Sequence, residues 1–271
     1  YGKCPECGNW NTFEEIEVLV EKKKSSLRRT PEKLIRVSDI KTINKKRIST
    51  GFEEFDRVLG GPVSPDGGQG GGIVSGEVIL LSGDPGIGKS TLLLQLSLNI
   101  AEAKTVFYIS GEESEDQVKL RAERIVDLKG MKKSELYILS STNIDSIIET
   151  LHDKKPDLVI IDSIQTMESE QFSGFPGSVP QVRFAASSII NFAKGNSIPV
   201  FLIGHVTKEG VVAGPMLLSH MVDCVLYLEG QELTGTKILR AFKNRFGDTS
   251  EVGIFTMEER GLVEISDTAS Y

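Results

Sequence analysis

The feature that most constrains this chain is a glycine-rich loop at residues 83–90, which reads Gly-Asp-Pro-Gly-Ile-Gly-Lys-Ser. Its spacing is G-x-x-x-x-G-K-[ST], that of a phosphate-binding P-loop. An apolar strand pattern at 77–82 precedes the loop, and a helical pattern at 91–96 follows it. A chance glycine turn would not need these flanks, so the sequence predicts a nucleotide site.

Each part of this loop has an expected role. Backbone N–H groups converge on phosphate oxygens, and the helix N-terminus adds partial positive charge. Lys89 is expected to reach the β- and γ-phosphates of ATP, and the Ser90 hydroxyl to ligate Mg²⁺. The residues predicted to bind the nucleotide are Gly83, Asp84, Pro85, Gly86, Ile87, Gly88, Lys89, Ser90 and Thr91.

A second apolar run, 157–162, ends in Asp162 and has the pattern of a Walker B strand. Its carboxylate is predicted to orient Mg²⁺ from the carboxyl edge of a sheet, where open α/β sheets bind ligands. Further strand patterns at 105–110, 137–139 and 198–204 alternate with helical segments. This alternation predicts an α/β fold with a mostly parallel, twisted sheet.

Polar residues at two other strand ends are candidates for catalysis. P-loop hydrolases need a group that orients or deprotonates the attacking water. Glu112 is our candidate and Glu113 the alternative, although both could simply be acids that stabilise a helix N-terminus. His205 either contacts the γ-phosphate or only ends its strand.

Composition sets the broad class. The 271 residues are 39% hydrophobic and 25% charged, which suits one large α/β domain with an appendage. We find no apolar run near the ~18 residues of a membrane span and no signal-peptide pattern. Three cysteines argue against a disulfide framework, so we expect a cytoplasmic protein with no membrane partner.

The first 47 residues differ from the remainder. Cys4 and Cys7 form half of a zinc site, so Zn²⁺ is expected only if a missing cysteine pair is supplied, and the alternative is no metal. Residues 21–47 hold eleven Lys or Arg and three acids, although the whole chain has a net charge of −7. They are either a solvated tether or an arm that contacts DNA. We therefore divide the chain into a partial zinc ribbon (1–20), a basic linker (21–47) and an ATPase domain (48–271).

Two loops draw attention by their composition. Residues 62–72 hold two prolines and five glycines and form either a lid or a surface insertion. Residues 169–183 follow the Asp162 strand, and a loop of this length is usually functional or disordered. At its exit, Gln181 and Arg183 are candidates for DNA contact, with a helix N-terminus as the other explanation. Phe172 and Phe175 could stack on bases, and Lys208 is a further DNA candidate.

Several of these segments together resemble the bacterial RadA (Sms) family of DNA-repair ATPases, which are RecA-like. The most distinctive are Lys243-Asn244-Arg245-Phe246-Gly247 and His-Val-Thr-Lys-Glu-Gly at 205–210. The chain departs from the family in three ways. It has only the second cysteine pair of the zinc ribbon, it stops before the family's Lon-protease-like domain, and residues 62–70 replace a short glycine turn.

The resemblance implies a RecA-like core in a homo-hexameric ring. Such a ring would be a DNA-dependent ATPase, a helicase-type motor on single-stranded DNA that drives branch migration with the recombinase RecA. Glu112 would match the catalytic glutamate and His205 the γ-phosphate sensor, while Lys243 and Arg245 would reach the neighbouring subunit's nucleotide unless they are a solvated strand end. The alternatives are a KaiC-like regulatory ATPase that binds no DNA, and a fragment that binds nucleotide without hydrolysing it.

Overall fold

The computed structural model describes residues 36–39, 47–60, 71–126, 134–172, 174–205, 215–230 and 235–265. The chain divides into two units, Tyr1–Ile43 and Asn44–Tyr271. In the first unit the described part contains one short 3₁₀ helix, η1 (Val37–Asp39). Cys4, Cys7, Lys208 and the loop 61–70 lie outside the described residues, so our predictions for them stay predictions.

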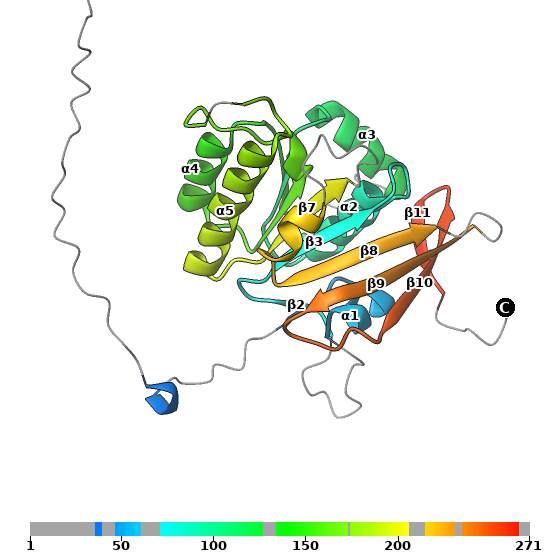
Figure 1. The fold of residues 1–271 in the computed structure, drawn as a ribbon. Helices are drawn as coiled ribbons and strands as arrows, with labels where there is room; N and C mark the ends of the chain where they lie inside the picture. Colours follow the sequence, from blue (N-terminus) through cyan, green and yellow to red (C-terminus); the bar gives the residue numbers. More distant parts are fainter. Residues whose placement is uncertain are drawn as a thin grey trace, which may run out of the picture. The chain divides into compact units, whose positions relative to one another are not determined.

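The second unit is built on one nine-stranded sheet with the order β11-β10-β9-β8-β3-β7-β6-β4-β5 (Figure 1). Six neighbouring strands are parallel, which confirms the predicted mostly parallel sheet, although the sequence indicated only five of them and not Cys224–Gly230. In sheet order they are β8 (Cys224–Gly230), β3 (Val78–Gly83), β7 (Val200–His205), β6 (Leu158–Asp162), β4 (Val106–Ser110) and β5 (Leu136–Ser140).

An antiparallel extension continues this sheet beyond β8. It consists of β9 (Thr236–Asn244), β10 (Val252–Glu258) and β11 (Gly261–Glu264). A separate small ribbon pairs β1 (Arg47–Ile48) with β2 (Ile73–Val74). The sequence analysis identified none of these five strands.

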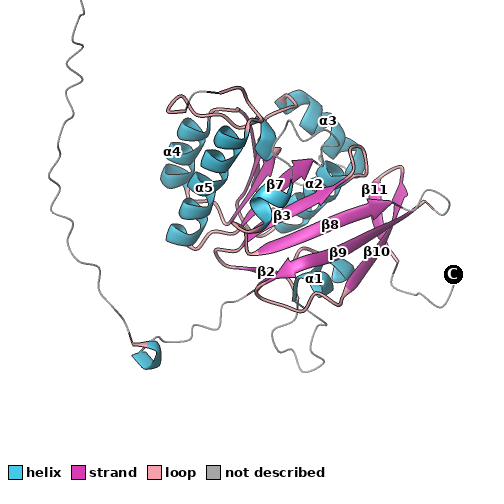
Figure 2. Cartoon of the chain, viewed as in Figure 1, coloured by secondary structure: helices cyan, strands magenta, loops and turns pink. Residues whose placement is uncertain are grey.

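Helices cover both faces of the sheet (Figure 2). The first layer is α1 (Glu53–Gly60), α2 (Lys89–Ile100) and α3 (Glu115–Ile125), and the second is α4 (Ile144–Lys154), α5 (Val179–Asn196) and α6 (Pro215–Ser219). A second 3₁₀ turn, η2 (Ile164–Thr166), follows β6. No helix in the described parts of the chain is long and apolar enough to cross a membrane.

The continuous apolar run of β3 follows from its central position. Ile79 and Leu81 pack in the hydrophobic cluster shared with α1, α2 and α3, whereas Val78 and Leu80 pack in the cluster shared with α4 and α5. All six residues of β3 are buried. A strand covered on both faces needs apolar side chains on both, which is why it reads as an uninterrupted run.

Candidate nucleotide site

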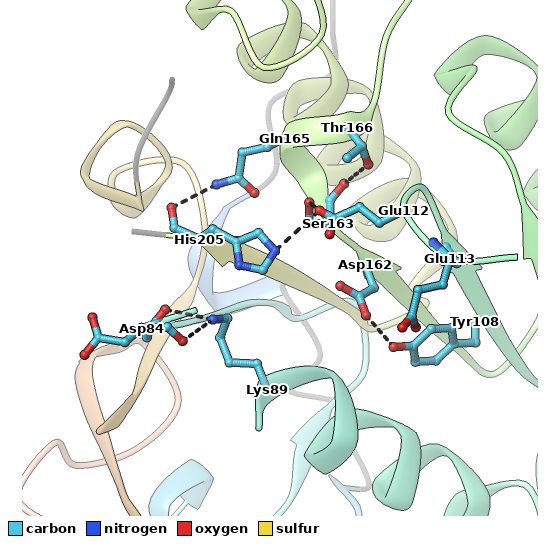
Figure 3. Close-up of polar contacts among 12 residues, drawn as sticks. Asp84, Lys89, Tyr108, Glu112, Glu113, Asp162, Ser163, Gln165, Thr166 and His205 are labelled. Carbon is cyan, nitrogen blue, oxygen red and sulfur yellow. Dashed lines mark hydrogen bonds and ion pairs between the residues drawn. The ribbon is translucent and has the colours of Figure 1, made fainter. Parts of the chain in front are cut away.

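The register of the parallel strands brings the predicted residues to one edge. Gly83 at the end of β3 pairs with His205 at the end of β7, and Ser110 at the end of β4 pairs with Asp162 at the end of β6. Because these strands run in the same direction, their carboxyl ends form a common edge. Lys89, Glu112, Asp162 and His205 therefore gather around one point (Figure 3).

The backbone of the P-loop requires glycine at positions 83 and 88. Gly83 has φ +146°, and a Cβ there would lie 2.3 Å from the carbonyl oxygen of Leu228. Gly88 has φ +115° and is the left-handed residue just before α2, which begins at Lys89. The loop thus turns directly into a helix N-terminus, the arrangement that favours phosphate. A pocket of about 200 Å³ lies there, lined by Gly86, Gly88, Lys89, Ser90, Thr91, Arg121 and His205.

Lys89 is buried within this loop. Its Nζ donates hydrogen bonds to the carbonyl oxygens of Gly83 at 2.7 Å and Asp84 at 2.9 Å. Burial lowers the pKa of Lys89, while the nearby carboxylates of Asp162, Asp84 and Glu112 oppose that shift. The lysine therefore sits among acceptors at the place where a phosphate-directed cation is needed.

Asp162 is held by a residue that the sequence analysis did not single out. The Tyr108 hydroxyl donates a 2.6 Å hydrogen bond to Asp162 Oδ2. Burial, and then the charge of Asp162, raise the pKa of Tyr108 well above its usual value, so the phenol stays a donor. No described residue donates to the other oxygen, Oδ1. A carboxylate oxygen held in this way, and the hydroxyl of Ser90 in the pocket lining, are oxygen ligands of the kind that Mg²⁺ prefers.

The two adjacent glutamates have different partners. Ser163 Oγ donates a 2.7 Å hydrogen bond to Glu112 Oε1, and His205 Nε2 lies 3.5 Å from the same oxygen (Figure 3). Glu113 instead forms an ion pair with Arg121 of α3. Glu112 therefore belongs to the group of Lys89, Asp162 and His205, and Glu113 does not.

Lys243 and Arg245 lie away from this site. Lys243 pairs with Val225 near the start of β8, and β9 runs antiparallel to the P-loop strand. Lys243 is therefore level with Leu80, and the Arg245 backbone N–H bonds the carbonyl oxygen of Asp223, whose own N–H bonds Val78 at the start of β3. Because Val78 lies roughly 16 Å along the strand from Gly83, Arg245 lies toward the edge of the sheet opposite to the P-loop. Lys243 Nζ donates to the carbonyl oxygens of Ser219 and Val222, both at 2.7 Å.

The neighbouring motif residues are also bound within the chain. Arg245 Nη1 lies 3.1 Å from Asp223 Oδ1, an acid that is buried and is also bound by Lys194. Asn244 Nδ2 donates to the carbonyl oxygen of Leu59 at 2.8 Å. A Cβ on Gly247 would come within 2.8 Å of the same carbonyl oxygen. Arg245 is half exposed, so its guanidinium is accessible from outside the chain.

The segment 169–183 is shorter as a loop than its sequence indicated, because α5 begins at Val179. Gln181 is buried, and its side chain bonds the backbone of Ser169, Phe172 and Gly174. It therefore fixes the loop and does not present its amide to DNA, which corrects our DNA assignment for this residue. It does not cap the start of α5 either, because its partners are all in the loop. Arg183 lies on the exposed surface of α5.

The two aromatic candidates in this loop also differ. Phe172 packs against Phe184 with ring centroids 4.5 Å apart. The Phe175 side chain is 86% exposed. Phe172 is partly exposed as well, but Phe175 is the ring of this loop that lies more fully in solvent.

Four residues that support the site had no sequence signal of their own. The sequence pattern places Tyr108 in a core strand and gives it no other role. It marks Ser163 only as the residue after Asp162. Gln165 Nε2 donates to the carbonyl oxygen of His205 at 3.2 Å, and Arg121 lines the pocket. Their roles depend on strand register and helix placement.

Among the described residues, no cluster of three or more His, Cys, Asp or Glu could hold a metal ion.

The fold and the site together define a RecA-like P-loop domain. Residues 48–211 match the family model described as an AAA domain. The fold is also similar to that of a KaiC-like protein from Pyrococcus horikoshii OT3, with a TM-score of 0.63 and 18% identity over 82% of this chain and 99% of that one. At this identity the likeness concerns the fold alone.

Sequence relatives narrow this class to one family. The chain is 47% identical over 266 residues to the DNA repair protein RadA of Streptococcus pyogenes serotype M1, and 45% identical over 272 residues to that of Bacillus subtilis strain 168. Each match covers 97% of this chain and 56% of the relative. The chain belongs to the RadA family of DNA repair proteins, and it spans about half the length of these relatives.

Proposed function

We propose that this chain is the ATPase core of a DNA-dependent motor that acts on single-stranded DNA and branched recombination intermediates. The observation that carries the proposal is the meeting of Lys89, Asp162, Glu112 and His205 at one edge of the sheet. Membership of the RadA family supports the role in DNA repair. A ring of six subunits and the recombinase RecA as a partner are part of the same proposal.

The residues of the site have distinct roles in hydrolysis. Lys89 and the backbone N–H groups of the P-loop bind the phosphates, and Glu112 orients the attacking water and accepts its proton. Ser163 positions the Glu112 carboxylate, and His205, beside the same oxygen, transmits the presence of the γ-phosphate. Ser90 and Asp162 would hold Mg²⁺, which when bound neutralises phosphate charge.

The far position of Arg245 supports a site completed by a second subunit. A side chain at the opposite edge of the sheet cannot reach its own P-loop, but a half-exposed guanidinium can reach a neighbour's. A cation supplied in trans stabilises the charge of the transition state. Lys243 would support the same contact.

DNA contact is proposed for the loop before α5. Phe175 presents an exposed ring, and Arg183 an exposed cation on the following helix. Stacking on bases and attraction to the phosphate backbone are the two usual components of single-strand binding. Lys208 and the basic segment 21–47 remain further candidates.

The test is ATP hydrolysis with and without single-stranded DNA. We expect DNA to raise the rate, and Lys89→Ala to abolish hydrolysis in both conditions. Phe175→Ala should retain the basal rate and lose most of the stimulation, with Tyr137→Ala, an exposed aromatic residue on β5, as the control outside the loop. A basal rate that DNA does not change would contradict the motor and favour the KaiC-like regulatory ATPase. Nucleotide binding without turnover would favour a binding fragment.

A further inference from the structure

Arg121 is a basic residue of the nucleotide pocket that has no role in the mechanism above. It lies in α3, and its side chain is only 16% exposed. The helix is fixed at its start by Ser114, whose side chain and that of Gln117 cap each other's backbone N–H. Arg121 therefore projects from a well-anchored helix, two turns beyond the cap.

The guanidinium of Arg121 is only partly satisfied. Its Nη2 contacts Glu113, but its Nη1 is buried and has no hydrogen-bond partner. A buried charged donor without an acceptor is costly, because it has lost water and gained nothing in return. The same side chain lines the pocket together with Gly86, Ser90 and Thr91 of the P-loop region.

Two explanations for Arg121 are possible. As a structural residue, it would only tie α3 to the segment after β4 through Glu113. That explanation leaves the unpaired Nη1 and the position in the pocket wall without a cause. An acceptor brought by a ligand accounts for both, and a guanidinium suits phosphate because it offers several N–H donors in one plane.

We propose that Arg121 binds the polyphosphate chain of the nucleotide in the same subunit, and that Glu113 is its positioning residue. This deepens the proposed function and rests on it. The two adjacent acids after β4, Glu112 and Glu113, then have different functions. Glu112 faces Ser163 and His205, while Glu113 orients the cation that binds phosphate.

Equilibrium binding of ATP, ADP and inorganic tripolyphosphate tests this assignment. Arg121→Gln should weaken binding of ATP and of tripolyphosphate by a similar factor, on the order of tenfold, as expected for loss of one charged hydrogen bond. Arg124→Gln, an exposed arginine one turn further along α3, should leave both affinities within about twofold. Glu113→Gln should weaken both by less than Arg121→Gln, because the cation remains.

A purely structural role predicts different results. It would lower the urea midpoint of Arg121→Gln and leave the affinity of the folded protein for ATP unchanged, which would overturn the proposal. Weaker ATP binding with unchanged tripolyphosphate binding would place Arg121 against the nucleoside and would overturn it too. Arg121→Lys retains the charge, so partial recovery of tripolyphosphate affinity is expected, and it replaces Arg121→Gln if that variant does not fold. A wild-type chain that bound neither ATP nor tripolyphosphate would refute the proposed function itself.

Discussion

At the residue scale, hydrogen bonds distinguish two glutamates that the sequence leaves equivalent. Glu112 accepts from Ser163 and lies beside His205, whereas Glu113 is paired with Arg121. A general base must be directed at the attacking water, and the Glu113 carboxylate is instead directed at Arg121. The surroundings of Glu112 thus support our choice of it over Glu113.

Replacement of each glutamate tests this choice. Glu112→Gln should retain ATP binding and reduce hydrolysis by about 100-fold or more, because the amide cannot accept the proton. Glu113→Gln should lower the rate far less at saturating ATP. Single-turnover hydrolysis and nucleotide binding, measured on both variants, distinguish an effect on the chemical step from an effect on binding. If Glu113→Gln stalls hydrolysis and Glu112→Gln does not, the roles are reversed.

At the scale of the element, the residue just before β3 is a buried acid, Glu77. The Glu77 side chain accepts a 2.9 Å hydrogen bond from the Val74 backbone N–H, and its other oxygen is buried without a partner. Burial raises the pKa of Glu77 from 4.5 to about 7, and the negative charge of Asp223 contributes, while Val74 and Arg47 oppose the shift. The short segment that connects β2 to β3 therefore contains an acid, Glu77, that stays protonated below about pH 7.

This pKa makes stability depend on pH in a defined direction. Between about pH 4.5 and 7 the folded state keeps a proton on Glu77 that the unfolded state has released. The free energy of unfolding therefore falls as pH rises through this window, by about 3 kcal/mol in total. Glu77→Gln removes the titration and should gain about 2–3 kcal/mol relative to wild type between pH 5 and pH 8.

Urea unfolding at the two pH values measures this gain. Glu123→Gln, on the exposed surface of α3, is the matched control and should follow wild type at both. A Glu77→Gln variant whose difference from wild type is the same at pH 5 and pH 8 would rule out a titrating Glu77 as the cause.

At the scale of the whole molecule, the two edges of the sheet present different functional residues. The P-loop and its acids lie at the carboxyl edge of the parallel strands, and the Lys243–Gly247 motif lies at the opposite edge. The motif is packed against the chain by Asp223 and Leu59, which fixes its position. A complete site would then require two copies of the chain, each contributing one edge.

Mixed subunits test this arrangement. Arg245→Ala should leave ATP binding nearly intact and reduce hydrolysis by ~10³-fold, the usual contribution of an arginine supplied in trans. It should also fold, because Lys194 still binds Asp223. Mixing Arg245→Ala with Lys89→Ala should restore part of the activity, since some interfaces then pair an intact P-loop with an intact arginine. Arg240→Ala, exposed on the same strand, is the control.

The outcome of mixing decides between two explanations. A surface role for Arg245 predicts little loss of activity on substitution. Failure of the two folded and co-assembled variants to recover any activity would contradict a shared site.

The sequence by itself determined the parts of this protein that depend on local pattern. The spacing of Gly83–Ser90 between an apolar strand and a helix predicted a P-loop, and the alternation of strand and helix patterns predicted a mostly parallel sheet, because glycine spacing and hydrophobic periodicity are local properties. The run ending in Asp162 was recognisable for the same reason. Tertiary structure alone decided the pairing of Tyr108 with Asp162, the burial of Gln181, the separation of Glu112 from Glu113 and the distance of Arg245 from the P-loop. Each depends on strand register or helix placement between residues far apart in the chain, which no local pattern encodes.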